Sequence, residues 1–266
     1  MVAAVAARGA GMEWAMAGLE PGVFWAAMAV TLFAGFVKGA VGFAMPLIMV
    51  SAFNGFLPPE LAVAGLILPT LITNLSQATR QGIGPALGSV RAYRRFLIAT
   101  VVFIVVSAPL LTVIPRMAYL LLLGVPVTVF AALQLMGVPL ALPLRRRAAA
   151  EWGLGVLGGL FGGISGIWGP PLLVYLLSIG AGKQEMVRVQ GVVFLIGAVA
   201  LLAAHLRTGV ADGASLGFSA ALVVPAMLGM AIGYRVQDRL DQARFRRWTQ
   251  GLLVVTGLNL VRQAVT

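Results

Sequence analysis

Cysteine is absent from the 266 residues, histidine occurs once, and charged residues make up only 10% of the chain. The lack of cysteine excludes disulfides, thiol redox chemistry and cysteine-bound metals. A soluble domain carries about 25% charged residues, so most of the surface of this protein cannot face water. We therefore expect neither an ordinary soluble protein nor a bound metal or cofactor.

Carboxylates are also scarce, and they occur only at the ends of apolar segments or between them. The eight acidic residues are Glu13, Glu20, Glu60, Glu151, Glu185, Asp212, Asp238 and Asp241. None is placed at mid-membrane, where it could bind a cationic substrate or relay protons. The chain thus lacks nearly every usual acid, base or metal ligand of an enzyme, and Ser165, considered as a nucleophile, has no evident base. We predict that the protein is not an enzyme.

Hydrophobic residues are abundant, at 60% of the chain. They gather in eight segments that are long enough to cross or enter a bilayer. These segments are 22–56, 60–79, 96–114, 117–138, 153–180, 189–206, 214–234 and 249–264. We predict an all-α integral membrane protein of the inner or plasma membrane, in which residues 1–266 form a single transmembrane domain.

Basic residues occur mainly in the short connections between the apolar segments, which accounts for the net charge of +11 without a nucleic-acid partner. Cytoplasmic loops of membrane proteins are enriched in lysine and arginine. We therefore place the N-terminus outside and assign the connections 80–95, 139–150, 181–188 and 235–248 to the cytoplasm. Of the 19 basic residues, 14 then face the cytoplasm and four lie outside, while Lys38 remains inside an apolar segment.

Segments 22–56 and 153–180 differ from the others because each is long, rich in glycine and interrupted by proline. Under the charge assignment, each must enter the membrane and return as a helical hairpin, one from each side. Residues 22–138 and 151–264 then form two inverted-topology repeats, joined by the cytoplasmic linker 139–150. Each repeat is predicted to be a broken hairpin followed by three transmembrane helices.

The glycines of the two hairpins support the repeat because their spacing is the same. The matching sets are Gly35, Gly39 and Gly42 in the first hairpin, and Gly162, Gly166 and Gly169 in the second. Pro46 matches Pro171 after a two-residue gap. We place the helix breaks near these prolines, because proline removes a backbone donor and clashes with the preceding turn. The alternative role of the glycines is close helix packing.

A helix that breaks inside the membrane leaves backbone groups that lipid cannot satisfy, so these groups must face protein or a wet cavity. Free N–H groups at a helix terminus suit an anion, and paired interruptions of this kind mark transporter sites. Lys38 is an intramembrane cation, which is by default a functional residue; the alternative is that it snorkels to an interface. The predicted substrate site comprises Lys38, Gly39, Gly42, Phe43, Asn74, Gln77, Ser165, Gly166, Trp168, Gly169 and Gln190.

The polar residues of the spans that follow the hairpins have two interpretations. Asn74, Gln77 and Gln190 either contact the substrate or form interhelical hydrogen bonds that hold the bundle together. His205, the single histidine, could titrate near neutral pH, although a lone histidine near an interface is more often incidental.

The sequence resembles the sulfite exporter TauE/SafE family over nearly its whole length. The resemblance rests on the two glycine motifs, on residues 57–64 at the entry to the second span, and on residues 233–240 and 245–248. It implies export or uptake of small anions, among them sulfite and organosulfonates. Two departures concern the first hairpin: Lys38 stands where the family often has a small residue, and Ala44-Met45 replaces part of a glycine-rich run.

Together these features predict a secondary transporter that exports a small anion such as sulfite or an organosulfonate. Alternating access would occur around a central site formed by the two broken hairpins. An anion channel, or an uptake permease for another small anion, is the alternative. The expected partners are the anionic substrate, the lipid bilayer and a coupling ion, H⁺ or Na⁺; a homodimer is left open.

Overall fold

A computed structural model describes residues 16–138, 146–237 and 242–265, and these residues form helices and no strand. The helices are α2 (Pro21–Val41), α3 (Met45–Phe53), α4 (Pro59–Thr79), α5 (Ile83–Ala92), α6 (Arg94–Ser107), the 3₁₀ helix η1 (Ala108–Thr112), α7 (Arg116–Leu135), α8 (Arg147–Ser165), α9 (Gly169–Ser178), α10 (Lys183–Thr208), α11 (Gly213–Gln237) and α12 (Gln242–Val265). The predicted all-α class is confirmed.

Within the described residues, six helices are long and apolar enough to cross a membrane. They are Pro21–Val41, Pro59–Thr79, Arg94–Thr112, Arg116–Leu135, Gln184–Thr208 and Gly213–Val236. Large apolar side chains such as Trp25, Val106 and Val255 are exposed on the outside of the bundle. Such a surface is stable against lipid and unfavourable in water. The chain is a multi-pass membrane protein.

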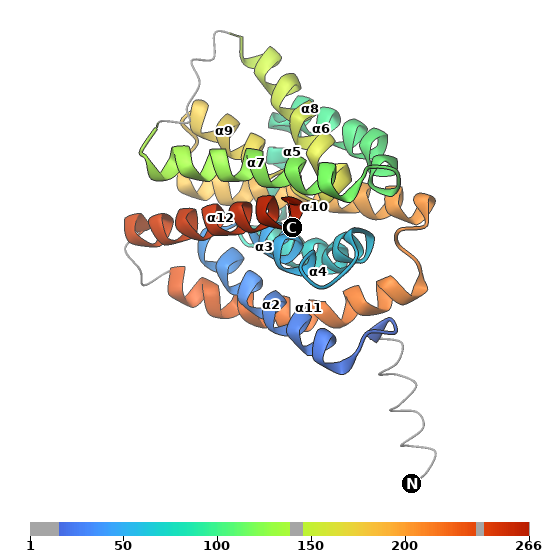
Figure 1. The fold of residues 1–266 in the computed structure, drawn as a ribbon. Coiled ribbons are helices and arrows are strands. Elements are labelled where there is room, and N and C mark those ends of the chain that lie inside the picture. Colours follow the sequence, from blue (N-terminus) through green and yellow to red (C-terminus); the bar gives the residue numbers. More distant parts are fainter. Residues whose placement is uncertain (1–15, 139–145, 238–241, 266) are drawn as a thin grey trace.

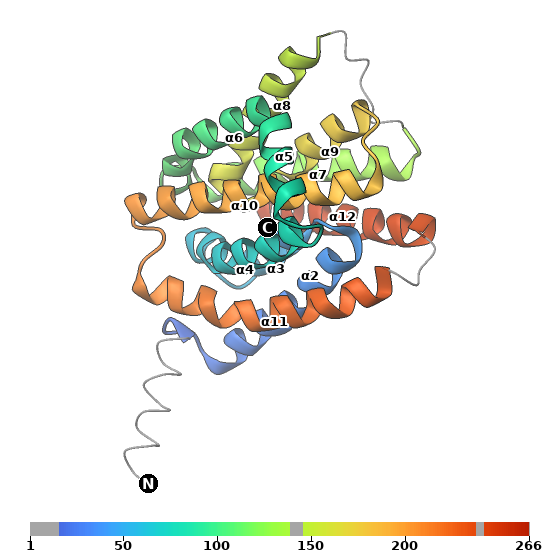
Figure 2. The ribbon, with the colours of Figure 1, turned by 180° about the vertical axis from the view of Figure 1, so that it is seen from behind.

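The helices pack in a bundle with a pairwise arrangement. Helix α2 packs along α11, α8 packs along α6, α7 packs along α12, and α4 packs along α10. Figures 1 and 2 show α2 and α11 on one side of the bundle, α6 and α8 on the opposite side, and α4 and α10 between them. The two predicted hairpins, α2–α3 and α8–α9, therefore lie on either side of the central α4–α10 pair.

Glycine, and not proline, ends the long arm of each hairpin. Gly42 follows α2 with φ of 91°, and Gly166 follows α8 with φ of 71°. Both are in the left-handed region, which glycine adopts without strain. Pro46 and Pro170 lie in the first turns of α3 and α9, where a missing N–H costs nothing. Each helix therefore breaks next to the predicted prolines, but glycine ends the incoming arm and the prolines begin the returning arm.

The helix ends also correct the register of the proposed repeat. Gly42 and Gly166, which end α2 and α8, are 124 residues apart, from the difference of their numbers. The same interval separates the starts of α3 and α9, at Met45 and Gly169. It separates the starts of α4 and α10 as well. The sequence comparison had matched Gly42 with Gly169, which is three residues too far along the chain.

Other glycines allow two helix pairs to approach closely. A Cβ added to Gly39 of α2 would lie 2.2 Å from the carbonyl oxygen of Met230 on α11. A Cβ added to Gly159 of α8 would lie 2.6 Å from the carbonyl oxygen of Thr100 on α6. Both distances are too short for real atoms, so any larger residue would push the helices apart. The predicted alternative role of glycines, close helix packing, applies to Gly39.

Basic side chains gather where α4 ends and where α6, α8 and α10 begin, and we call this the basic end of the bundle. Arg188 donates to Gln81 Oε1 at 2.8 Å and to Ser89 Oγ at 3.0 Å. Arg80 lies 4.1 Å from the ring centre of Tyr234. The clustering of these residues at one end agrees with the charge pattern that we used to predict the cytoplasmic side.

The four predicted cytoplasmic connections are more helical than expected. The connection 80–95 contains α5, whose ten residues start at Ile83. Helix α8 begins at Arg147, α10 at Lys183, and α11 continues to Gln237. The terminal turns of these helices are polar and basic. The hydropathy pattern therefore placed the ends of the predicted apolar segments inside the actual helices.

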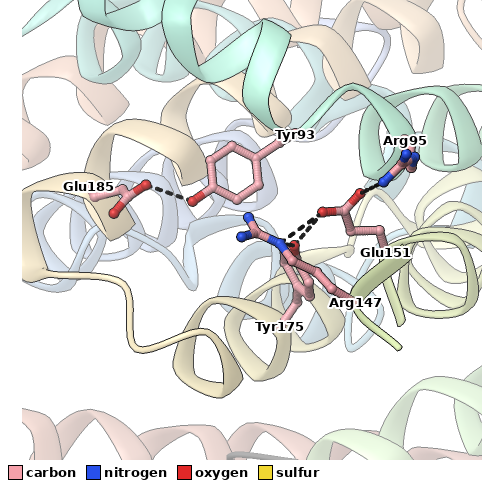
Figure 3. A network of polar contacts seen from close by, with 6 residues as sticks. All are labelled: Tyr93, Arg95, Arg147, Glu151, Tyr175 and Glu185. Carbon is pink, nitrogen blue, oxygen red and sulfur yellow. Dashed lines mark hydrogen bonds and ion pairs between the residues drawn. The ribbon is translucent and has the colours of Figure 1, made fainter. Parts of the chain in front are cut away.

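A buried acid forms the centre of a polar network at the basic end (Figure 3). Glu151 of α8 is 3% exposed and accepts a hydrogen bond from the Tyr175 hydroxyl at 2.5 Å. Arg147 and Arg95 pair with its carboxylate at 3.3 Å and 3.7 Å. Nearby, Tyr93 donates to Glu185 at 2.7 Å. Burial, and then Glu185, raises the pKa of Tyr93, so this phenol remains a donor.

Replacing Glu151 with alanine is expected to lower the free energy of unfolding by about 1–3 kcal/mol, because the buried Tyr175 hydroxyl loses its acceptor. The two arginines are about half exposed and can turn to water. The measurement is the midpoint of thermal unfolding in detergent. Glu60→Ala, which removes an exposed acid from the first turn of α4, is the control and should change the midpoint less. Equal changes in the two variants would contradict a structural role for Glu151.

Candidate functional site

Lys38 lies in the last turn of α2, and its side chain is buried at 1% exposure. Its Nζ donates to Thr73 Oγ1 at 2.9 Å and to Asn74 Oδ1, both on α4. The Thr73 hydroxyl in turn donates to the carbonyl of Pro69 at 2.6 Å. The side chain points into the bundle toward α4, and this burial does not fit a lysine that snorkels to an interface.

Among the described residues, Lys38 forms no ion pair with a carboxylate. Helices α2, α3 and α11 contain no acidic residue, and Glu60, the only acid of α4, precedes Thr73 by 13 residues. The two ion pairs found among the described residues both involve Glu151. Burying an unpaired charge costs several kcal/mol. An amine in this position is suited to a ligand that brings its own negative charge.

Two glutamines hold the break of the first hairpin. Gln77 of α4 donates from Nε2 to the carbonyl of Gly42 at 2.9 Å and to the carbonyl of Val187 at 2.9 Å. Gln190 of α10 lies on the same side, because its Oε1 would be 3.2 Å from a Cβ at Gly42. Gln77 thus ties the end of α2 to α10 across the centre of the bundle, which is the interhelical role that the sequence had left open.

Several buried polar atoms near the two breaks have no hydrogen-bond partner among the described residues. They include Thr70 Oγ1, Asn74 Nδ2, Gln77 Oε1 and Trp168 Nε1. Asn74 and Trp168 present N–H donors, and Thr70 can present a hydroxyl donor. Buried donors are normally satisfied, so these three donors, like the acceptor Gln77 Oε1, are available to a ligand or to water.

A cavity of about 30 Å³ lies between the two breaks. This is room for a water molecule or two. The lining is mostly apolar and comes from both hairpins, with Thr70 as the hydroxyl-bearing residue: Phe43, Ala44, Pro46, Leu47, Thr70, Val127, Phe130, Gly166, Ile167, Trp168, Gly169, Pro170 and Phe194.

Helix α10 shows how deep within the bundle this cavity lies. Gly42 faces Gln190, and Gly166 faces Leu201. These α10 residues are 11 positions apart, from their numbers, which is about 16 Å along a helix. Phe194, which lines the cavity, lies between them and close to the middle of α10. The two breaks therefore flank the centre of the membrane-spanning part.

The structure separates the predicted site residues into two neighbouring groups and removes two of them from direct contact. Lys38, Asn74, Gln77, Gln190 and Gly42 surround the first break, and Phe43, Gly166, Trp168 and Gly169 line the cavity. Gly39 instead packs against α11. Ser165 closes the end of α8, donating to Phe161 O at 2.6 Å and accepting from Ile167 N at 3.2 Å.

The corresponding positions around the second break are apolar. With the 124-residue interval, Lys38 corresponds to Gly162 and Thr73 corresponds to Gly197. The Trp168 ring fills the space next to both glycines, at 2.7 Å and 2.9 Å from their added Cβ positions. The prolines Pro170 and Pro171 also remove N–H donors from the start of α9. The helix-terminus donors that we expected at both breaks are therefore scarce at the second one.

Phe130 and Phe194, which form cavity walls, were not predicted. Thr73, which accepts the Lys38 hydrogen bond, and Thr70, which lines the cavity, were second-tier candidates outside the predicted set. A phenylalanine in an apolar span looks the same in sequence whether it faces lipid, core or cavity. Thr73 lies on the same helical face as Thr70, Asn74 and Gln77, and that spacing was the available signal.

The described residues contain no group of three side chains that could hold a metal ion. A search of curated proteins and a search of solved structures found no significant match to the chain. A comparison with family models matched residues 27–260, which include both helix breaks and every polar residue of the site, to the family described as Sulfite exporter TauE/SafE. The chain belongs to the TauE/SafE family of membrane transport proteins.

Proposed function

We propose that the protein is a secondary transporter of a small anion, bound between the two hairpin breaks. The observation that carries the proposal is the burial of Lys38 without a carboxylate on any of α2, α3 and α11. Asn74, which accepts from this amine, and Thr70 and Trp168, which line the cavity, each have a buried polar atom without a partner among the described residues. The description of the family, which names sulfite export, supports the same class of substrate.

The two hairpins are proposed to belong to inverted repeats that move against each other. The equal 124-residue interval and the reciprocal pairing of α2 with α11 and α8 with α6 support this relation. Transporters built in this way open a central site to each side in turn. The cavity between the two breaks would be the central site of that cycle. Export of sulfite or an organosulfonate remains the leading form of the proposal.

A thermal-shift screen of the purified protein tests whether an anion binds. The ligands are sulfite, sulfate, methanesulfonate, sulfoacetate, taurine and acetate, each with the same counterion. A ligand at about 100 times its Kd stabilises the folded protein by about 2.7 kcal/mol, so at least one anion should raise the unfolding midpoint measurably. A protein that none of these anions stabilises would contradict the proposal.

Flux in proteoliposomes distinguishes a transporter from an anion channel. The proposal predicts flux of the binding anion that saturates with concentration and accelerates when the same anion is present on the other side. A flux that rises linearly and shows no such exchange would favour a channel, which is the alternative function. In proteoliposomes the experimenter imposes the gradients, so flux there does not distinguish export from uptake. Measurements in cells, whose membrane sets the gradients, are needed for that distinction.

A further inference from the structure

We infer that Lys38 is an unprotonated amine when the site is empty and takes up one proton with each anion, so that H⁺ is the coupling ion. The inference rests on the proposed anion site and adds to it the second species carried. It assigns the proton to a named atom, Lys38 Nζ, which is buried at the end of α2 and bonded to Thr73 and Asn74 of α4.

The hydrogen bonds of Lys38 match a neutral amine. A neutral amine has two N–H donors, whereas an ammonium has three. Among the described residues, Nζ has two acceptors, Thr73 Oγ1 and Asn74 Oδ1. The Thr73 hydroxyl is already committed as a donor to Pro69 O, so it can only accept from Lys38. Protonation would add a third N–H without an acceptor, in a place where no water reaches the side chain.

The charges around Lys38 also oppose a permanent ammonium. Helix α11 contributes Tyr234 and Arg235, and α3 contributes no titratable group. Helices α4, α10 and α12 contribute ionisable groups at or near their ends: Glu60 and Arg80 on α4, Glu185, Arg188 and His205 on α10, and Arg262 on α12. Glu60 lies 13 residues before Thr73, and Glu185 is bonded to Tyr93. An ammonium at Lys38 would thus be buried without an ion pair among the described residues, which is unfavourable.

An anion removes both obstacles at once. It accepts the third N–H of the ammonium, and it accepts from Asn74 Nδ2, which has no other partner among the described residues. On the loading side, the neutral amine binds the anion and takes one proton from the solution, which gives an ammonium–anion pair. On the other side the anion leaves, and the ammonium returns the proton to that solution. A monoanion carried in this way moves no net charge across the membrane.

The test is the number of protons taken up when the purified wild-type protein binds methanesulfonate, sulfate or sulfoacetate. These anions stay ionised between about pH 6 and pH 10, so any proton taken up belongs to the protein. Calorimetric titrations in two buffers of different ionisation enthalpy give this number. We expect a value that approaches about one proton per anion at alkaline pH, with Kd rising about tenfold per pH unit there.

Variants assign the proton to its atom. Lys38→Arg keeps a permanent cation and is expected to bind the anion without proton uptake. If this variant does not fold, the wild-type proton count still decides the inference. His205→Gln removes a buried imidazole, and Arg91→Ala removes an exposed cation; both should keep the wild-type proton uptake.

The outcomes distinguish a failure of proton coupling from a failure of the proposed anion site. Anion binding with no proton uptake at any pH overturns proton coupling and leaves the anion site intact. Proton uptake that persists in Lys38→Arg, or that disappears in His205→Gln, overturns the assignment to Lys38. A wild-type protein that binds none of the three anions overturns the anion site and this inference together.

Discussion

Replacing Lys38 with methionine is expected to reduce anion flux in proteoliposomes by about tenfold to a hundredfold while the protein still folds. A hydrogen bond to a charged group contributes about 1.5–3 kcal/mol, and each 1.4 kcal/mol is a factor of about ten. Methionine keeps the length and the flexible packing of the side chain but supplies neither charge nor donor. Asn74 Oδ1 loses its donor in this variant, so we expect a modest fall in the unfolding midpoint as well.

The matched control for this substitution is Arg91→Ala, which removes one positive charge from an exposed position of α5. It should leave both the flux and the unfolding midpoint close to those of the wild type. Size-exclusion chromatography of both variants in detergent shows whether they are folded. A folded Lys38→Met protein that carries the anion as fast as the wild type would remove Lys38 from the site.

Replacing Gly39 with alanine is expected to destabilise the fold by about 1–3 kcal/mol or more, because overpacking at a close contact costs that amount. The new Cβ would lie 2.2 Å from the Met230 carbonyl oxygen and 2.9 Å from Met230 Cα. Both are backbone atoms of α11, so relief requires α2 and α11 to separate. The measurements are the yield of monodisperse protein and the midpoint of thermal unfolding.

Gly22→Ala, on the same helix, is the control for this second substitution. A Cβ at Gly22 meets nothing within 4 Å, and alanine favours the helix over glycine by about 1 kcal/mol. Its midpoint should equal or exceed that of the wild type. If Gly39→Ala were as stable as Gly22→Ala but lost anion binding, Gly39 would contact the substrate directly, as the sequence had suggested.

The hairpins and the buried lysine were predictable because their signals are local. Charge placement required segments 22–56 and 153–180 to return to the side from which they entered, and the structure has a helix pair in each. Lys38 was identified because a cation inside an apolar segment is rare. The breaks lie next to the predicted prolines, but the role of Pro46 and Pro171 differs, because proline disrupts a helix interior and is well tolerated in the first turn of a new helix.

The difference between the two breaks could not be predicted, because it depends on which side chains meet across the bundle. Gly42 faces Gln190 and Gln77, whereas Gly166 faces Leu66 and Leu201. These pairs come from residues far apart in the chain. The apparent glycine match between the hairpins concealed the correct register, in which Lys38 corresponds to a glycine and Trp168 fills the space beside it.

The role of a charged site is tested most directly by comparing anions with uncharged molecules of the same shape. Methanesulfonate with dimethyl sulfone, and acetate with acetamide, are two such pairs, and binding to the wild type can be measured by calorimetry. The buried amine of Lys38 predicts that in at least one pair the anion binds at least about tenfold more tightly than its neutral partner, and that Lys38→Met removes the difference. Equal affinities within both pairs, or no binding by either anion, would contradict an anion site built on Lys38.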